Sequence, residues 1–150
     1  MIELENLTKQ FGTRAPAVRG VSLRVADGEF LVLIGESGSG KTTTLNMINR
    51  LTEPTSGRVL IDSEDVRAGD AVSVRRKMGF VFQEVGLFPH MTVGENIGIT
   101  PRLLGWPASE IDARVHELLG LVQLESAAVA SRFPAQLSGG QRQRVGLARA

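Results

Sequence analysis

The stretch from Gly35 to Thr42 constrains the chain more than any other, because it reads GESGSGKT and matches G-x-x-x-x-G-K-[ST] at every specified position. Glycines in this pattern let backbone N–H groups approach phosphate oxygens that a Cβ would block. Lys41 supplies a positive charge for the β and γ phosphates, and the Thr42 hydroxyl can bind Mg²⁺. The stretch therefore predicts a phosphate-binding P-loop. The residues expected to contact the nucleotide are Gly35, Glu36, Ser37, Gly38, Ser39, Gly40, Lys41, Thr42 and Thr43.

The alternative is a glycine-rich loop that merely joins a strand to a helix. The flanking sequence favours the P-loop, because the continuous apolar run Phe30–Ile34 predicts a strand buried on both faces. Leu45, Ile48 and Leu51 then recur at helical spacing, which predicts a helix whose positive N-terminal end faces the phosphates.

Composition excludes several other classes of protein. With 150 residues the chain can form one domain with a core, and its net charge of +1 gives no basic field for nucleic acid. It has no cysteine, which excludes disulfides and thiolate metal sites. No secretory signal is visible, and no apolar run approaches the roughly 18 residues of a membrane span. We therefore expect any membrane role to come through a partner.

The first half of the chain predicts a mixed α/β lobe. Alternating apolar residues predict an edge strand over 2–7 and a second strand over 18–25, and a short strand is expected at 59–61. A short helix is expected over 70–77 with Asp70 as its N-cap. Another buried strand is expected over 78–82.

From Gly86 onward strand-like runs disappear and helical periodicity takes over. Pro107, Ser109 and Asp112 predict a helix start with a capping box, followed by one apolar face made of Ile111, Val115, Leu118 and Leu119. The pattern predicts an α/β nucleotide-binding lobe over 1–85 and a helical lobe over 86–150.

Four features together resemble the ATP-binding subunit of ABC transporters, and the resemblance covers the whole chain. They are Phe11, the P-loop, Gln83 and the segment Leu137–Gln141, which reads LSGGQ and is called the signature segment below. Residues 84–97 resemble the membrane-coupling region of bacterial importers. Residues 42–57 and Gly146 are similar to the glycine betaine, choline and carnitine (osmoprotectant) branch.

The resemblance implies a P-loop NTPase fold, a mixed sheet around the P-loop helix with a helical subdomain, and ATP with Mg²⁺ as ligands. It implies that Phe11 stacks on adenine, that Lys41 and Gln83 serve catalysis, and that Thr42 and Gln83 reach Mg²⁺. Ser138, Gly139, Gly140 and Gln141 would contact the ATP of a second subunit in a head-to-tail dimer. Ser138 suits this role because it can cap a helix, and the glycines expose backbone N–H groups.

The resemblance also implies partners and a location. They are a membrane permease, a second ATPase subunit and, indirectly, a solute-binding protein, but no nucleic acid. The expected location is the cytoplasmic face of the plasma membrane. Arg142, Arg144 and Arg149 are interpreted as a solvated or interface face, and His116 as a structural or exposed residue.

In the family, a strand ending in Asp and a catalytic Glu follows the signature helix, and a switch histidine comes later. The sequence reaches Ala150 before any of them, and His90 does not match the switch position. Asp62, Glu64 and Asp65 lie on the wrong side of the signature segment to substitute. We therefore expect the 150 residues to be the N-terminal part of such a subunit. They should bind nucleotide weakly and barely hydrolyse it, because loss of a general base costs roughly 10²–10⁴-fold.

Two alternatives stay open. The chain could be a non-catalytic nucleotide-binding module that acts by dimerisation or sequestration. It could also be a non-transport ABC ATPase of DNA repair or translation, although the importer-like segment 84–97 argues against that.

Overall fold

The computed structural model describes all of residues 1–150, which divide into two units, Met1–Gly79 and Phe80–Ala150. The division into a nucleotide-binding lobe over 1–85 and a helical lobe over 86–150 remains a prediction.

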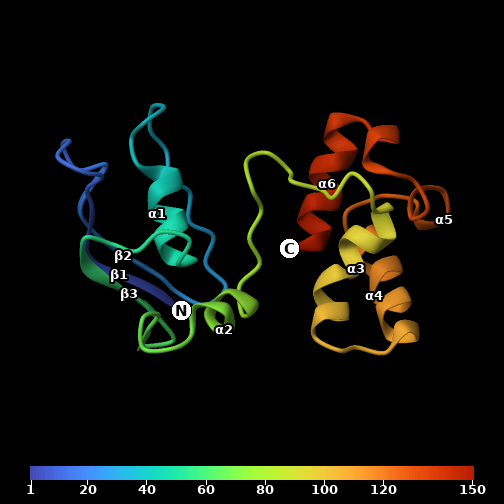
Figure 1. The fold of residues 1–150 in the computed structure, drawn as a ribbon, viewed down its shortest axis with the longest axis horizontal. Helices are drawn as coiled ribbons and strands as arrows, with labels where there is room; N and C mark the ends of the chain where they lie inside the picture. The colour runs from blue at the N-terminus through green and yellow to red at the C-terminus, as the bar shows by residue number, and fades with distance from the viewer. The chain divides into compact units, whose positions relative to one another are not determined.

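The first unit is built on a small antiparallel sheet in the order β2-β1-β3-β4 (Figure 1). Its strands are β1 (Ile2–Lys9), β2 (Val18–Val25), β3 (Ser56–Ile61) and β4 (Glu64–Asp65). Leu4 of β1 pairs with Leu23 on one side and with Val59 on the other. The prediction of an edge strand at the start of the chain is therefore wrong, because β1 lies between two strands.

Two helices accompany this sheet. Helix α1 (Lys41–Ile48) follows the P-loop as predicted and buries Met47 in the core of the first unit. The other buried apolar residues of that core are Leu4, Leu7, Val18, Val59 and Val66. Helix α2 (Ala71–Arg76) begins as predicted, because the Asp70 carboxylate accepts a hydrogen bond from the Ser73 N–H at 2.9 Å.

Two predicted buried strands do not form. Phe30–Ile34 is an irregular segment in which Phe30 is 90% and Ile34 92% exposed. Met78–Phe82 is likewise irregular, with Val81 and Phe82 exposed. A buried strand needs hydrogen-bonding neighbours and cover on both faces. None of the four strands pairs with either segment.

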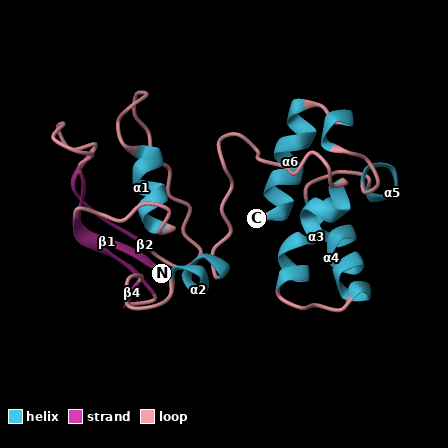
Figure 2. Ribbon diagram, viewed as in Figure 1, coloured by secondary structure: helices cyan, strands magenta, loops and turns pink.

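The second unit contains helices and connecting loops but no strand (Figure 2). It contains α3 (Val93–Leu103), α4 (Ala108–Leu121), α5 (Ser126–Val129), a 3₁₀ turn (Pro134–Gln136) and α6 (Gly139–Arg149). The predicted apolar face of α4 is confirmed, since Ile111, Val115 and Leu119 are buried and Leu118 packs against the same core. Helices α3 and α6 complete that core with Val93, Ile97, Val145 and Ala148.

Helix starts in this unit differ from the sequence prediction in one case. Helix α4 has Pro107 as its N-cap with no side-chain cap, so the capping box at Ser109 and Asp112 is wrong. The helix begins before Ser109, which places the hydroxyl inside the first turn. A capping box forms instead at α3, where Thr92 and Glu95 exchange hydrogen bonds. None of the helices combines the length and apolar character needed to cross a lipid bilayer.

Candidate nucleotide-binding site

The P-loop turns tightly into α1, and glycine conformations make the turn. Gly38 has φ +85° and Gly40 has φ +90°, both in the region that L side chains rarely adopt. A Cβ at Gly40 would also collide with the carbonyl oxygen of Ala17. The backbone therefore requires glycine at position 40 for both conformation and space.

Lys41 is held inside this turn by its own loop. Its ammonium donates hydrogen bonds to the carbonyl oxygens of Gly35 and Glu36, each at 2.7 Å, and to the Ser39 hydroxyl at 3.1 Å. No carboxylate forms a salt bridge with Lys41. Its positive charge is positioned but not neutralised, which suits an anionic ligand.

The first turn of α1 carries further groups for a phosphate. Helix α1 has no side-chain cap and no acidic residue in its first turn, so its positive end is uncompensated. The Thr44 hydroxyl is used within the helix, donating to the Gly40 carbonyl at 3.0 Å. The Thr42 side chain, in contrast, is exposed and makes no hydrogen bond to the protein. Its oxygen is the kind of hard ligand that Mg²⁺ prefers, so this residue fits a metal bound alongside phosphates.

Phe11 lies in the loop after β1 and is half exposed, at 50%. The Lys9 ammonium lies 5.0 Å from the centroid of its ring. The same loop continues to Ala17, whose carbonyl approaches Gly40 at the start of α1. The first unit thus brings the Phe11 loop to the P-loop, and the stacking of Phe11 on a base remains a prediction.

The signature segment opens α6 with a complete capping box. The Ser138 hydroxyl accepts from the Gln141 N–H at 3.2 Å, and the Gln141 side chain accepts from the Ser138 N–H at 2.9 Å. Gly139 and Gly140 are exposed, and a Cβ on either would meet nothing within 4 Å. The segment therefore presents open backbone at a helix N-terminus.

The other residues singled out in the sequence belong to the second unit. Gln83 is exposed in an irregular segment of the second unit. Arg142 donates to the carbonyl of Leu137, and Arg144 donates to the carbonyls of Val122 and Gln123. Both arginines are thus used within their own unit.

His116 has a local partner too, since its Nδ1 lies 2.7 Å from the Ser126 hydroxyl. That contact supports the interpretation of His116 as a structural residue.

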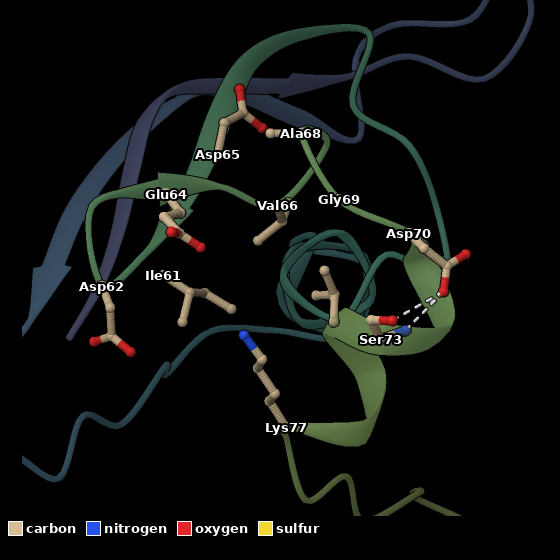
Figure 3. Close-up of a pocket in the computed structure, with 11 residues that line it drawn as sticks. Ile61, Asp62, Glu64, Asp65, Val66, Ala68, Gly69, Asp70, Ser73 and Lys77 are labelled. Atoms are coloured by element: carbon tan, nitrogen blue, oxygen red, sulfur yellow. Dashed lines mark hydrogen bonds between the residues drawn. The ribbon is translucent and has the colours of Figure 1, made fainter.

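A cavity of about 470 Å³ in the first unit is lined by four acidic residues that follow β3, namely Asp62, Glu64, Asp65 and Asp70, and none of the predicted nucleotide-binding residues lines it (Figure 3). A side-chain hydrogen bond from Arg67 lowers the pKa of Asp65. The N-terminal ammonium lowers the pKa of Asp62 in the same way. Asp62 and Asp65 therefore already have cationic partners.

Sequence reasoning missed two residues of the second unit. Asn96 is fully buried and makes four hydrogen bonds, and the Arg149 guanidinium binds two backbone carbonyls. Asn96 was detectable in principle, because it interrupts the apolar stripe of Val93 and Ile97 at helical spacing. Nothing in the local sequence distinguishes Arg149 from its neighbouring arginines.

Comparison with known proteins gives one consistent result. Residues 18–150 match the ABC transporter family. The osmoprotectant import ATP-binding protein OsmV of Salmonella typhimurium is 51% identical over the whole chain, and the chain covers 40% of it. The choline transport ATP-binding protein OpuBA of Bacillus subtilis is 49% identical, with 39% covered. The glycine betaine uptake ATP-binding protein YehX of Escherichia coli is also 49% identical, with 48% covered. The chain therefore spans less than half the length of these relatives.

A solved structure agrees. It is the dimer of an ATP-binding cassette in a post-hydrolysis state bound to ADP and phosphate. That cassette is 39% identical with a TM-score of 0.90, and the match covers 99% of this chain and 68% of that one. The fold is thus that of an ATP-binding cassette, and the chain belongs to the ABC transporter family.

Proposed function

We propose that the protein binds ATP with Mg²⁺ as the nucleotide-binding subunit of an importer and couples ATP binding and hydrolysis to solute uptake. The observation that carries the proposal is the Lys41 ammonium, fixed in the P-loop by three neutral oxygens and left without a carboxylate partner. A charge held in this way is preorganised for phosphate oxygens.

Residues of the first unit, together with Gln83 of the second unit, would share the binding of one nucleotide. The N–H groups of Gly38 to Thr43 would surround the phosphates, and Phe11 would stack on the adenine. Thr42 would hold Mg²⁺, with Gln83 contributing to the metal and to the attacking water. When bound, Mg²⁺ would neutralise part of the negative charge on the phosphates.

The second unit would serve the nucleotide of another subunit. Ser138 is already used to cap α6, so contact with a γ-phosphate would come mainly from the exposed backbone of Gly139 and Gly140. A head-to-tail dimer in which each subunit offers this helix end to its partner's ATP is supported by the relative that was solved as a dimer.

The solute is a small osmoprotectant in this proposal, with a quaternary amine as its chemical class. The support is the named relatives, which serve osmoprotectant, choline and glycine betaine import. The partners would be a membrane permease and, through it, a solute-binding protein. The subunit would then act at the cytoplasmic face of the membrane.

These 150 residues alone would bind nucleotide but hydrolyse it slowly. Asp62 and Asp65 have the N-terminal ammonium and Arg67 as partners, so neither is free to act as a general base. Without such a base, hydrolysis loses roughly 10²–10⁴-fold.

Nucleotide binding tests the proposal directly. Lys41→Ala should weaken the affinity for a fluorescent ATP analogue with Mg²⁺ by about tenfold or more. Lys77→Ala removes the same charge from an exposed position of the same unit, and should leave the affinity unchanged. Equal affinity of Lys41→Ala and the unmodified protein would contradict the proposal. If the 150 residues hydrolyse ATP steadily and Lys41→Ala abolishes that turnover, the expectation of slow hydrolysis is wrong, while the proposal of ATP binding still stands.

The importer assignment has its own test. Pro89 and His90 are exposed within the importer-like segment, so replacing both by alanine changes the surface and spares the core. We expect this variant to lose co-purification with a membrane permease, whereas Glu110→Ala on the exposed start of α4 keeps it. Retained co-purification would remove the support for segment 84–97 as the coupling surface.

A further inference from the structure

The cavity of about 470 Å³ in the first unit takes no part in the proposed function. All of its lining residues come from one stretch of the chain, residues 61–77, which contains the end of β3, β4 and α2. Neither Phe11 nor any residue of the P-loop lines it. Its volume lies in the range of about 300–1,000 Å³ that is typical of small-molecule sites. The cavity is therefore a candidate site for a second ligand.

Hydrogen bonds within the protein hold the walls of this cavity in place. Arg50, which follows α1, donates to the carbonyls of Val66 and Gly69 at 2.8 and 2.7 Å. The Asp70 carboxylate accepts from the N–H and the hydroxyl of Ser73 at 2.9 and 3.2 Å. Because these bonds form without a ligand, the cavity is preformed, and binding does not have to order its walls.

The floor of the cavity is apolar. Ile61 at the end of β3, Val66 after β4 and Val74 in α2 contribute aliphatic side chains to the lining. Val66 is buried, whereas Ile61 and Val74 are half-buried and keep part of their surface free. An apolar body placed on this floor would remove that surface from water, which favours binding without selecting a charge.

Three of the four acidic residues in the lining are already engaged. Asp62 pairs with the N-terminal ammonium, and Asp65 pairs with Arg67. Asp70 is the N-cap of α2. Figure 3 shows these three carboxylates directed away from the cavity. They are therefore poorly placed to hold a ligand inside it.

Glu64 and Lys77 differ from these residues in direction and in pairing. Figure 3 shows both side chains directed into the cavity from opposite sides, with Ile61 between them. Glu64 comes from β4, and Lys77 is the C-cap of α2. Both are exposed, and neither forms a salt bridge, with the other or with any third residue. The cavity thus offers one unpaired charge of each sign on either side of an apolar floor.

We propose that this cavity binds a small zwitterion, a molecule that carries an ammonium group and a carboxylate on one apolar frame. Glu64 faces the ammonium group, Lys77 faces the carboxylate, and the frame lies on Ile61 and Val66. A ligand with a single charge would leave one of the two charged side chains without a partner, so a zwitterion fits best. The inference does not depend on the proposed function, because the cavity shares no residue with the P-loop.

Carnitine is a suitable probe, because it carries a quaternary ammonium group and a carboxylate on one short chain. Choline carries only the ammonium group, and butyrate carries only the carboxylate. Each is titrated into isotope-labelled protein while the chemical shifts of the backbone amides are followed by NMR. We expect carnitine to shift the amides of residues 61–77 along a saturating curve, with an affinity about threefold or more above that of choline or butyrate. The absence of a saturating shift with carnitine would overturn the proposal, and so would equal affinity for either of the singly charged probes.

Two substitutions separate the roles of the two charges. Glu64→Gln should weaken carnitine and choline by about threefold or more without weakening butyrate, because the ammonium loses its partner. Lys77→Gln should weaken carnitine and butyrate by a similar factor without weakening choline. Both residues are exposed, so both variants should fold. Affinities for all three probes that change equally, or not at all, would overturn the assignment of Glu64 and Lys77.

Glu3→Gln and Arg76→Gln are the matched controls. Glu3 lies in β1 and Arg76 lies in α2 directly before Lys77, and neither lines the cavity. Each control removes a charge of the same sign as its counterpart and should keep the full affinity for carnitine. Losses equal to those of Glu64→Gln and Lys77→Gln would mean that only the net charge of the unit matters, and would overturn the proposal.

Two further variants test the place of the site. Val74→Phe adds a ring to the floor of the cavity and should weaken all three probes by about threefold or more, independently of charge. Lys41→Ala should leave the affinity for carnitine unchanged, just as Lys77→Gln should leave the affinity for ATP unchanged. Full carnitine binding in Val74→Phe, or its loss in Lys41→Ala, would place the zwitterion elsewhere and overturn the proposal.

Discussion

The protein has two glycine-rich helix starts, and they are built in opposite ways. The P-loop enters α1 with no capping side chain, with positive φ at Gly38 and Gly40, and with no space for a Cβ at position 40. The signature segment enters α6 with a complete capping box, and its glycines have ordinary φ and open space around them. The fold requires the first set of glycines but not the second.

This difference bears on function, because a glycine inside a helix costs roughly 0.5–1 kcal/mol relative to alanine. Gly139 and Gly140 carry that cost with no internal reason, since neither a turn nor a neighbouring side chain needs them. A ligand from outside the chain that comes close to the exposed backbone would explain both glycines. The comparison thus separates glycines that shape the protein from glycines that meet a ligand.

The largest expected effect is that of Gly40→Ala on stability. The substitution forces a side chain into φ +90° and against the Ala17 carbonyl, so we expect a loss of about 2–3 kcal/mol in the free energy of unfolding. Denaturant unfolding measures it. Gly38→Ala is the control for conformation alone, because its φ of +85° comes with open space, and it should cost only about 1–2 kcal/mol. Equal stability of Gly40→Ala and the unmodified protein would contradict the role given to this glycine.

Ser138→Ala should have the next largest effect. It removes the hydroxyl that caps α6, which costs about 1 kcal/mol in the free energy of unfolding. Ser109→Ala in the first turn of α4 is the matched control, because that helix has no side-chain cap, and it should stay within about 0.5 kcal/mol. Similar losses from both serines would show that the cap of α6 contributes nothing special.

These features also show which parts of the molecule a sequence can predict. The caps at Asp70 and Ser138 and the buried face of α4 were predictable, because residues within a few positions decide them. The capping box at Thr92 is equally local, since Thr92 and Glu95 stand three residues apart. The P-loop and the signature segment were predictable for the same reason, because each is defined by consecutive residues.

The errors have a different physical origin. Phe30–Ile34 has the composition of a buried strand, but a strand forms only where neighbouring strands supply hydrogen bonds, and none of the four does so. The central position of β1 depends on its pairing with β3, which lies far along the chain. Arg149 binds the carbonyls of Gly86 and Val85, which lie 63 and 64 residues earlier in the chain. No local pattern indicates such a contact.

Gly140→Ala should separate stability from function. The new methyl group enters open space in a helix, so stability should rise by about 0.4–1 kcal/mol. ATP-dependent dimerisation, measured by analytical ultracentrifugation, should nevertheless weaken, because the Cβ covers the backbone offered to the partner's phosphate. Gly120→Ala is the control, since it lies in α4 with open space around it and should leave dimerisation unchanged. Unweakened dimerisation of Gly140→Ala would remove the ligand-based explanation of this glycine.

The smallest expected effect is a difference between the capping boxes of α3 and α6 in how their contribution to stability depends on pH. Helix α3 uses Glu95 where α6 uses the neutral Gln141. The Thr92 backbone N–H and then its side chain lower the pKa of Glu95 below its usual 4.5. A carboxylate with a lowered pKa in the folded state adds stability above the unfolded value, and that stability is lost as the pH falls through the folded value.

Glu95→Gln keeps the box and removes the charge, so the unmodified protein should be the more stable of the two at pH 7. The difference should shrink below about pH 4.5 and vanish at lower pH, whereas Gln141→Glu should introduce the same pH dependence at α6. Denaturant midpoints of each variant from pH 7 to pH 3 measure both. The other carboxylates with lowered pKa titrate alike in each protein, so the difference isolates one residue. A difference independent of pH would show that the Glu95 charge does not contribute to the cap, and that the boxes of α3 and α6 stabilise their helices by hydrogen bonds alone.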